Sequence, residues 1–419
     1  MKVNIIGAGI SGLYTAYLLS KSGVEVEIFE ASKRSGGRIL SLAYENNKHV
    51  ELGAEVIYDT NGLLVKTINT LNDPICELCG DNYYYYQQQI KPFSQWKDNA
   101  AITQLLDDIY EIEDYEGEET SLLNHFQQKS YYNSDMINLV EAFACEYGTN
   151  ADQLGVRNLV LEENAWSGGD EEYYFHSRMQ NVADYYKNFV SERIQYAKII
   201  KHISYGDSSV SITDQNNEQH ISDKVIVSVN LGILKAGDIG FSPALPEAKR
   251  NAIQSIGIDQ GIKVILIFSQ QWWPDDLLTI EGGSSCHEFL ATKVYKLPTL
   301  TGFVMGRRAK QCKNMDNKQL GEMLCNELDT LFGHKHASNT LESVFHKNWG
   351  EDIFQKGAYS FPTKNSNGMR EVLAQTVDNK LYFMGEACNT NGHAASIHGA
   401  METAEEVYQE IMSELARNE

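Results

Sequence analysis

The chain contains 419 residues, of which 42% are hydrophobic and 22% are charged, a composition that predicts a globular protein of about two to three domains. Its 35 basic and 57 acidic residues leave a net charge of −22, which argues against nucleic acid and anionic membranes as partners because both require a basic surface. The apolar runs are shorter than the about 20 residues of a membrane span and no signal peptide is recognised, so no membrane association and a cytoplasmic location are expected.

The N-terminal segment has the order strand, glycine turn, helix and strand. Lys2–Ile6 is a short apolar run, Gly7–Gly12 has the sequence GAGISG, and a helical pattern follows from Leu13. Residues 24–29 alternate as a second strand that ends at Glu30. This order predicts a βαβ unit at the start of an α/β fold.

The spacing Gly7-x-Gly9-x-x-Gly12 is typical of a dinucleotide site. The first glycine makes a tight turn, the second admits the pyrophosphate, and the third lets helix and strand pack closely. The helix then directs free N–H groups and a positive dipole end at the phosphates. Glu30 can accept hydrogen bonds from an unphosphorylated ribose, which favours FAD or NAD over NADP.

The seven cysteines are an odd number and predict reduced thiols rather than a disulfide framework. Cys76 and Cys79 form a single CxxC. The pair lacks both the context of a redox motif and a second ligand pair for zinc. We therefore interpret it as two unrelated thiols and expect no metal.

The rest of the chain alternates between helical and strand patterns. Helices are predicted at 136–147, 180–196 and 396–415, and strands at 210–213, 224–229, 263–268 and 380–384. Residues 107–119 hold eight acids, and residues 170–172 hold three more. The simpler interpretation of the first run is a solvated loop, whereas the second run is as well explained by attraction of a polycation to the substrate site.

Several longer segments resemble the flavin amine oxidase family, which includes monoamine oxidases, polyamine oxidases and histone lysine demethylases. The similar segments are EASKRSGGRI (30–39), ELGAEV (51–56), SDKVIVSVNLGILK (222–235), IKVILIFSQQWWP (262–274), NWGEDIFQKGAYSFP (348–362) and LYFMGEACNTNGHAASIHGAMETAEEV (381–407). They follow the family order, and residues 75–160 are the least similar. The polyamine oxidases are the closest in style.

The resemblance implies FAD as the cofactor. Ala358 occupies the position where monoamine oxidases carry the cysteine that bonds the flavin, so the FAD is expected to be non-covalent. The expected cofactor-binding residues are Gly7, Gly9, Ile10, Ser11, Gly12, Glu30, Arg34, Gly36, Gly37, Arg38, Gly53, Ala54, Glu55, Ile200, Trp349, Gly385, Glu386 and Ile397.

The resemblance also implies three catalytic residues. Lys263 matches the lysine that holds a water near flavin N5 and assists reoxidation by O2, although a lysine at a strand end could also point at solvent. Trp349 and Tyr359 match aromatic residues around the flavin, and ordinary core packing is their alternative role.

Further positions are candidates for the substrate pocket. Ser396 replaces the second tyrosine of the monoamine oxidase pair, a difference shared with relatives that act on longer, secondary amines. His398 matches a polyamine oxidase histidine, although a structural role is equally consistent. Glu55 and the pair Tyr58-Asp59 follow the flavin-contacting LGA and complete the candidates. Ala43 stands where amino-acid oxidases often carry an arginine, which makes amino-acid substrates less favoured.

The predicted fold is α/β, with a Rossmann-like FAD-binding domain from residues 1–75, 196–240 and 366–419. A discontinuous mixed α+β substrate-binding domain takes residues 76–195 and 241–365. The expected reaction is oxidation of a small-molecule amine, in particular a polyamine or other secondary amine. Hydride equivalents pass to flavin N5, the imine hydrolyses, and O2 is reduced to H2O2. A flavin monoamine or L-amino-acid oxidase and a flavin-binding regulatory protein without turnover remain alternatives, and the oligomeric state is not predicted.

Overall fold

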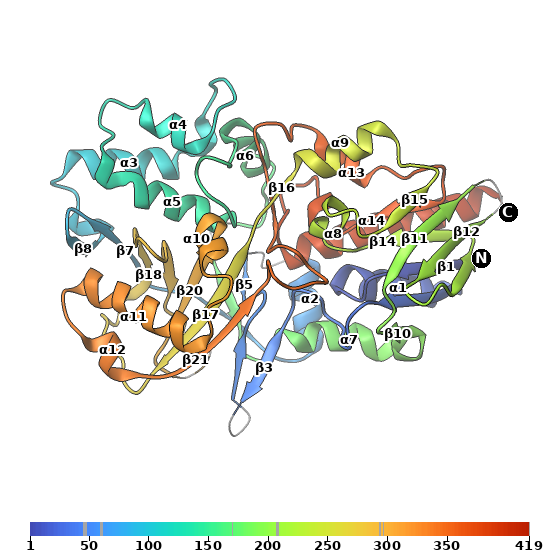
Figure 1. Cartoon of the computed structure of the whole chain (residues 1–419), viewed down its shortest axis with the longest axis horizontal. Coiled ribbons are helices and arrows are strands. Elements are labelled where there is room, and N and C mark those ends of the chain that lie inside the picture. Colours follow the sequence, from blue (N-terminus) through green and yellow to red (C-terminus); the bar gives the residue numbers. More distant parts are fainter. Residues whose placement is uncertain are drawn as a thin grey trace.

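The computed structural model describes residues 1–44, 48–58, 62–169, 171–206, 209–292, 295 and 297–418. Two large sheets lie side by side along the long axis of the molecule (Figure 1). Both termini lie at the end that carries the parallel sheet, on the right of Figure 1. The other sheet, with helices above and below it, occupies the opposite end.

The first sheet contains five parallel strands collected from distant parts of the chain. Their order is β10 (Ile194–Tyr196), β2 (Glu25–Glu30), β1 (Lys2–Ile6), β14 (Lys224–Val227) and β23 (Leu381–Phe383). The helices α1 (Ile10–Lys21), α7 (Gln180–Val190) and α14 (Ile397–Asn418) bury their apolar residues in the same core as β1 and β2. This arrangement confirms the predicted α/β, Rossmann-like fold.

The other face of the parallel sheet is covered by a smaller sheet. Its strands are β13 (Gln219–Ser222), β12 (Val210–Asp214), β11 (Ile200–Tyr205) and β15 (Gly240–Ser242). Ile203 and Ile212 from this sheet share a core with Val225 and Val227 of β14. The strands of the parallel sheet are therefore apolar on both faces, which explains their continuous hydrophobic runs in the sequence.

The prediction of one helix over 180–196 is wrong at its C-terminal end. Helix α7 ends at Val190, and a short 3₁₀ turn leads into strand β10. The strand forms because Ile194–Tyr196 pairs in parallel with Ile28–Glu30 of β2. Pairing with a residue far away in sequence overrides local helical preference here.

The second large sheet has seven strands and is antiparallel except where β18 meets β7. Its order is β21 (Leu341–Asn348), β17 (Gly261–Phe268), β20 (Thr299–Met305), β19 (Glu288–Leu290), β18 (Leu277–Glu281), β7 (Asp81–Tyr86) and β8 (Gln89–Pro92). Around it lie α3 (Ala100–Tyr110), α4 (Leu122–Gln127), α5 (Ile137–Glu146), α6 (Val156–Glu163), α10 (Gly306–Gln311), α11 (Asn317–Phe332) and α12 (His336–Thr340). This unit corresponds to the expected α+β part, whereas the exact domain boundaries stay a prediction.

The remaining described strands form three smaller pairings. They are the hairpin β3 (Ser41–Tyr44) with β4 (Lys48–Glu51), the sheet β5 (Val56–Ile57), β9 (Tyr173–Phe175) and β6 (Ile75–Glu77), and β16 (Gly257–Ile258) with β22 (Ser360–Phe361). Cys76, Cys145, Cys286, Cys312, Cys325 and Cys388 are free thiols. Within the described residues, no helix is both long and apolar enough to cross a membrane.

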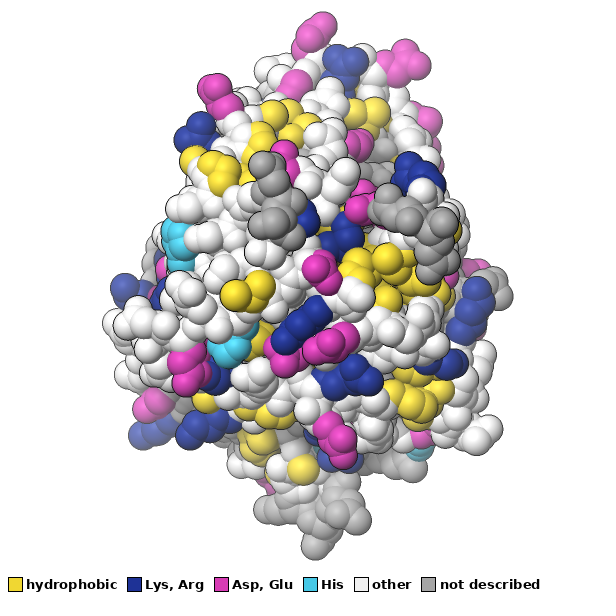
Figure 2. Space-filling view, turned by 90° about the vertical axis from the view of Figure 1, so that its right-hand side faces the viewer, with side chains coloured by type: hydrophobic (Ala, Val, Ile, Leu, Met, Phe, Trp, Pro, Cys, Tyr) yellow, Lys and Arg dark blue, Asp and Glu magenta, His cyan; other side chains and the backbone are white. Residues whose placement is uncertain are grey.

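Acidic and basic side chains are interspersed at the end of the molecule that lies on the right in Figure 1. Figure 2 shows lysine and arginine side chains lying among aspartate and glutamate side chains on this face. The net charge of −22 is therefore not displayed here as a continuous acidic surface. Acidic residues gather instead around the cavity described next.

Candidate active site

A cavity of about 1400 Å³ extends from the glycine turn after β1 to the helices of the seven-stranded sheet. Small-molecule sites usually measure roughly 300–1,000 Å³, so this space is large enough for a cofactor together with a substrate. All the predicted site residues that the structure describes line it, except Gly12 and Arg34. Asp59, also a candidate, lies outside the described residues.

The three glycines of the turn have different surroundings. A Cβ atom at Gly12 would lie 2.1 Å from the carbonyl oxygen of Gly7, so this position packs helix against strand and does not face the cavity. A Cβ atom at Gly9 would meet no protein atom within 4 Å. Gly9 is also the N-cap of α1 and provides no capping side chain for the first N–H groups. Open space and free N–H groups together form an anion site that fits a pyrophosphate.

Glu30 is held in place at the end of β2. Its carboxylate accepts hydrogen bonds from the main-chain N–H groups of Ala8 (2.7 Å) and Ser32 (2.8 Å). It lines the cavity together with Ile200, the first residue of β11. A fixed carboxylate beside the glycine turn fits the ribose of a dinucleotide.

Arg34 shapes the neighbouring loop instead of contacting the cavity. Its guanidinium donates to the carbonyl oxygens of Ser35 (3.2 Å), Ile39 (3.0 Å) and Gly37. The resemblance implied a direct cofactor contact for Arg34, but these bonds give it a positioning role. It holds the loop that places Arg38 at the cavity.

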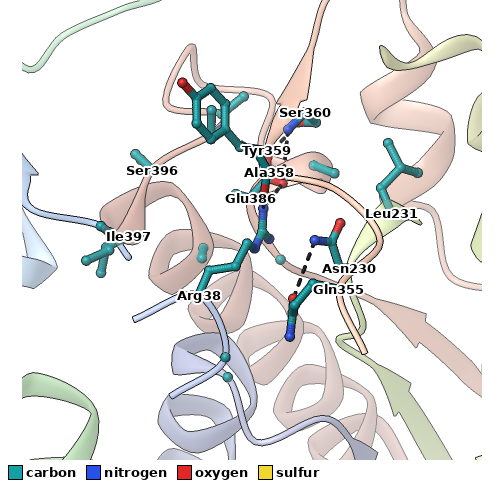
Figure 3. Close-up of a pocket in the computed structure, with 18 of the residues that line it drawn as sticks. Arg38, Asn230, Leu231, Gln355, Ala358, Tyr359, Ser360, Glu386, Ser396 and Ile397 are labelled. Atoms are coloured by element: carbon teal, nitrogen blue, oxygen red, sulfur yellow. Dashed lines mark hydrogen bonds and ion pairs between the residues drawn. The ribbon is translucent and has the colours of Figure 1, made fainter. Parts of the chain in front are cut away.

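Arg38 and Glu386 form an ion pair across the cavity wall. Arg38 Nη1 donates to Glu386 Oε1 and to the carbonyl oxygen of Ala358, both at 2.8 Å (Figure 3). Burial raises the pKa of the Glu386 carboxyl, but the charges of Arg38 and Arg370 outweigh this effect and the net pKa is lowered. Glu386 therefore remains an anion although only 4% of its side chain is exposed.

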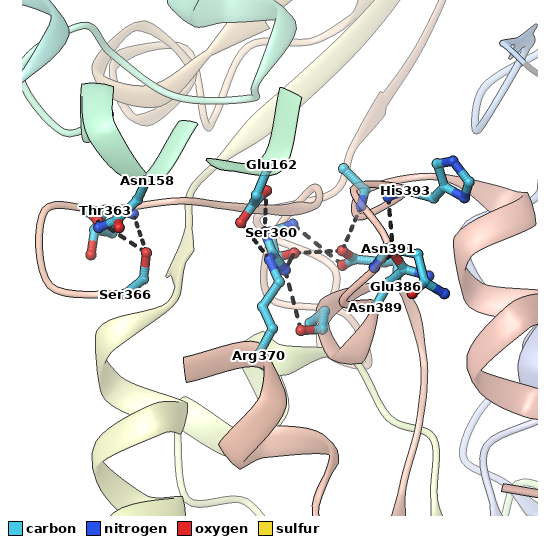
Figure 4. Close-up of polar contacts among 12 residues, drawn as sticks. Asn158, Glu162, Ser360, Thr363, Ser366, Arg370, Glu386, Asn389, Asn391 and His393 are labelled. Carbon is cyan, nitrogen blue, oxygen red and sulfur yellow. Dashed lines mark hydrogen bonds and ion pairs between the residues drawn. The ribbon is translucent and has the colours of Figure 1, made fainter. Parts of the chain in front are cut away.

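A second layer of polar residues supports this pair (Figure 4). Ser360 Oγ donates to Glu386 at 2.5 Å, and Arg370 donates to Ser360 Oγ at 2.7 Å and to Glu162 at 2.7 Å. The sequence did not single out Ser360, Arg370 or Glu162. Their partners lie up to 208 residues away in the chain, and no local spacing connects them.

Lys263 extends from β17 into the cavity and contacts the segment that follows β4. Its Nζ lies 2.9 Å from the carbonyl oxygen of Gly53 and 2.5 Å from Glu55 Oε2. Glu55 also accepts a hydrogen bond of 2.8 Å from the hydroxyl of Tyr295. The sequence indicated Lys263 and Glu55 separately, but neither their pairing nor Tyr295.

The two predicted aromatic residues line the same part of the cavity. Trp349 Nε1 donates to the carbonyl oxygen of Leu52 at 2.9 Å, next to Gly53. The Tyr359 hydroxyl donates to the carbonyl oxygen of Glu146 at 2.9 Å, and its ring packs against Gly148. Burial raises the pKa of the Tyr359 hydroxyl well above its usual range, so this group stays protonated.

Ser396 and His398 stand at the start of α14. Ser396 Oγ accepts a hydrogen bond of 2.9 Å from the N–H of Gly399 and donates at 2.7 Å to the carbonyl oxygen of His393. Its hydroxyl therefore caps the helix while the residue lines the cavity. His398 is buried, with its ring 5.6 Å from that of Trp166, and Trp166 also contacts Tyr58 edge-on.

Carboxylates surround the part of the cavity that lies in the α+β unit. Glu146, Glu163, Glu172 and Glu281 line it, and within the described residues none of the four forms an ion pair with a lysine or arginine. Glu163 accepts a hydrogen bond from Tyr147 at 2.7 Å and Glu281 accepts one from Thr279 at 3.1 Å. Of the eight acidic residues at 107–119, only Glu113 is among the lining residues.

Burial and mutual repulsion make these carboxyls weak acids. Burial raises the pKa of Glu281 to about 7, with Glu172 adding to the effect. Burial, with the charges of Glu281 and Glu172, raises the pKa of the neighbouring Glu288 to about 8. The pKa of Glu146 is raised for the same two reasons. Ionising all of these carboxyls without a cation nearby would cost free energy, because each one is buried and repels the others.

Residues 10–412 match the family of flavin-containing amine oxidoreductases. The chain belongs to this family. It is 25% identical to polyamine oxidase 2 of Arabidopsis thaliana, over 96% of this chain and 86% of that one. It is 26% identical to lysine-specific histone demethylase 1 homolog 1 of the same plant, but spans only 50% of that protein. The structure of wild-type putrescine oxidase bound to putrescine has the same fold, with a TM-score of 0.82 over 99% of both chains at 17% identity.

As a family member, the chain is an FAD-dependent amine oxidoreductase, which confirms the predicted cofactor and class of reaction. The residues around the cavity fit that group. Gly9 and Gly385 both leave open space where a Cβ atom would lie, and Arg38 faces the same space. Ala358 offers only a methyl group, so the flavin is held without a covalent bond. The individual site residues stay predictions.

Proposed function

We propose that the protein oxidises polyamines or other amines with more than one cationic nitrogen, with O2 as the electron acceptor. Bound FAD supplies the redox chemistry by taking hydride equivalents from the carbon next to the reacting nitrogen. The imine then hydrolyses, and O2 is reduced to H2O2. In this proposal the chain consists of the FAD-binding and substrate-binding domains predicted from the sequence. The reaction takes place in the cavity between them.

The observation that carries the substrate class is a set of cavity carboxylates to which the described residues provide no lysine or arginine partner. Glu146, Glu172 and Glu281 come from three separate segments of the chain and line one space. A monoamine brings one positive charge and leaves the other carboxylates repelling one another. A polyamine brings several charges along a flexible apolar chain and can compensate more than one carboxylate. Aromatic rings at Tyr84, Tyr110, Phe143, Tyr147 and Phe303 line the same space and suit the methylene segments.

In this proposal the side chains and backbone of the protein bind and orient the cofactor and the substrate. Gly9, Glu30, Arg38 and Glu386 hold the cofactor, while Trp349 and Tyr359 supply an apolar wall beside the reacting carbon. Lys263 provides an ammonium that favours negative charge developing during reoxidation. No side chain needs to act as a base, because a neutral amine can release hydride equivalents directly.

Two alternatives make different demands on the cavity. Amino-acid oxidases of this family often hold the substrate carboxylate with an arginine, but among the described cavity residues Arg38 is the one arginine and it is paired with Glu386. Ala43, where such an arginine was considered, is exposed on β3 and does not line the cavity. A monoamine oxidase needs an apolar pocket, which the unpaired carboxylates oppose. The relative named polyamine oxidase 2 supports the polyamine proposal.

The proposal can be tested by mixing the flavin-loaded protein anaerobically with single amines. Spermine, spermidine, putrescine, benzylamine and a set of L-amino acids are each added while flavin absorbance is followed. We expect rapid bleaching by the polyamines and slow bleaching by the others. Preferential bleaching by benzylamine or by an amino acid would contradict the substrate class, and no bleaching by any amine would favour a flavin-binding protein without turnover. A cytoplasmic location stays a prediction.

A further inference from the structure

Lys263 and Glu55 form a buried ion pair in the wall of the cavity. Lys263 Nζ lies 2.5 Å from Glu55 Oε2, and the two side chains are 6% and 4% exposed. Lys263 belongs to β17, whereas Glu55 lies directly before β5, 208 residues away in sequence. A buried pair of this kind is strongly coupled, because either charge alone would be costly at that depth.

The contacts of Lys263 leave one direction open. An ammonium group has three N–H donors, and the Gly53 carbonyl oxygen and the Glu55 carboxylate accept two of them. No described oxygen or nitrogen atom accepts the third; Nζ lies 5.7 Å from the centre of the Phe303 ring, which lines the cavity together with Lys263. The pair therefore presents a single N–H, in a fixed direction, to whatever occupies the cavity next to Gly53.

Glu55 is itself fixed on its other side by Tyr295. The Tyr295 hydroxyl accepts a hydrogen bond of 3.0 Å from the N–H of Glu51, so its own proton is directed at Glu55 Oε1, 2.8 Å away. Burial and the charges of Glu55 and Glu51 raise the pKa of Tyr295 well above its usual range, so the hydroxyl remains a donor. Both oxygens of Glu55 are thus engaged, and the carboxylate cannot turn away from Lys263.

We propose that Glu55 is a positioning residue that directs the Lys263 ammonium and compensates its charge beside the flavin. This inference rests on the cofactor placement given above, but not on which amine is oxidised. The flavin would meet a nearly neutral pair with one directed N–H instead of an uncompensated cation. Removing either charge should then change the stability of the electron-rich reduced cofactor, and in opposite directions.

The test is a cycle of the variants Glu55→Gln, Lys263→Met and the double variant, measured without any amine. Glutamine keeps the acceptor for Lys263 while removing the negative charge. We expect Glu55→Gln to raise the flavin midpoint potential by at least about 30 mV, a tenfold change for a two-electron couple. Lys263→Met should lower the potential, and the double variant should lie near the parent. Glu171→Gln, which removes an exposed carboxylate that does not line the cavity, should leave the potential unchanged.

Thermal unfolding of the same variants tests the interaction between Lys263 and Glu55 independently of the flavin potential. We expect each single variant to unfold at a lower temperature than the parent, and the double variant to lose less than the two single losses combined. Additive losses would overturn the pairing. A shift in potential with Lys263→Met but none with Glu55→Gln would overturn the role of Glu55. Coupled unfolding with no shift in any variant would show that the flavin does not lie beside the pair, which would also overturn the proposal.

The cofactor content of the variants also tests whether Glu55 compensates the charge of Lys263. Loss of flavin from Glu55→Gln with retention in the double variant would support charge compensation. Loss from all three variants would contradict it, since the double variant is neutral at this position. Because no amine is used, a failure of polyamines as substrates would leave each of these outcomes unchanged.

Discussion

The Arg38 guanidinium donates to the Glu386 carboxylate at 2.8 Å, which joins residues 348 positions apart in the chain. Arg38 belongs to the segment that follows β2, and Glu386 follows β23 at the edge of the same parallel sheet. The pair therefore closes the cofactor space from two ends of the sequence. The lowered pKa of Glu386 reflects this closure, since the charges of Arg38 and Arg370 outweigh the effect of burial.

We expect Arg38→Ala to destabilise the protein and to release its flavin. Breaking a buried ion pair costs about 3 to 5 kcal/mol, and we expect the lower part of this range because 27% of the Arg38 side chain is exposed. The measurements are urea unfolding and the ratio of flavin to protein absorbance after gel filtration. Arg250→Ala is the matched comparison, since Arg250 is an exposed arginine that does not line the cavity. Equal flavin retention in Arg38→Ala and the parent would contradict the assignment.

Two glycine substitutions should separate packing from cofactor binding. At Gly12 an added methyl would lie 2.1 Å from the Gly7 carbonyl oxygen, so Gly12→Ala should destabilise the fold by about 1 to 3 kcal/mol. At Gly9 the same methyl enters open space, so Gly9→Ala should leave the unfolding of the flavin-free protein unchanged while weakening flavin binding. Unfolding of the apoprotein and flavin titration measure the two effects. Similar behaviour of the two variants would show that Gly9 does not face the cofactor.

The cofactor half of the site was largely predictable because its chemistry is local in sequence. The glycine turn, the strand that ends at Glu30 and the GGR segment each combine a spacing with a physical requirement, and all but Gly12 and Arg34 among the described predicted residues line the cavity. Gly12 lets α1 pack against the turn after β1, and Arg34 holds the loop that carries Arg38. A glycine can leave room for a cofactor or for a neighbouring backbone. The spacing of the glycines alone did not distinguish these two roles.

The substrate half was less predictable because its residues come together only through long-range pairing. Glu146 ends α5, Glu172 precedes β9 and Glu281 ends β18, and no motif links these three positions. The sequence at 107–119 is densely acidic, yet Glu113 is the one acidic residue of this run that lines the cavity. In the second run Glu172 lines the cavity and Glu171 does not, while Asp170 lies outside the described residues.

Replacing Lys263 with methionine should slow reoxidation of the reduced flavin in air by at least roughly tenfold, because the variant loses a directed N–H donor and leaves the Glu55 charge uncompensated near developing negative charge. The reductive half-reaction with spermine should change less, since it needs no cation at this position. Stopped-flow absorbance separates the two steps. Lys201→Met provides a comparison, because Lys201 also lines the cavity but belongs to β11. An unchanged oxidative rate in Lys263→Met would show that this lysine does not assist O2 reduction.

Glu172→Gln should weaken the use of polyamines selectively. A charge-assisted hydrogen bond contributes about 1.5 to 3 kcal/mol, so the KM for spermine should rise by roughly tenfold or more. We expect Glu172 to pair with a second, distal cation of the polyamine, so the KM for a monoamine should change little. Glu171→Gln is the matched control, since the neighbouring carboxylate is exposed and does not line the cavity. Equal effects on spermine and on a monoamine would contradict a distal cation site.

The raised carboxyl pKa values predict opposite effects of pH on stability and on polyamine affinity. Burial raises the pKa of Glu281 to about 7 and that of Glu288 to about 8, so between about pH 5 and 8 the folded state should bind more protons than the unfolded state. Stability of the amine-free protein should therefore fall as pH rises through this range. Affinity for spermine should rise over the same range, because the carboxyls must lose their protons to pair with its cations.

The Glu281→Gln variant tests the origin of this pH dependence. Glutamine does not titrate, so the variant should lose part of the fall in unfolding temperature between pH 5 and 8. The half-saturation for anaerobic flavin reduction by spermine should also become less dependent on pH. Reduction by benzylamine provides the baseline for the titration of the amine itself. A parent protein that gains stability between pH 5 and 8 would show that these carboxyls are ionised without a cation and would remove this support for a polycationic substrate.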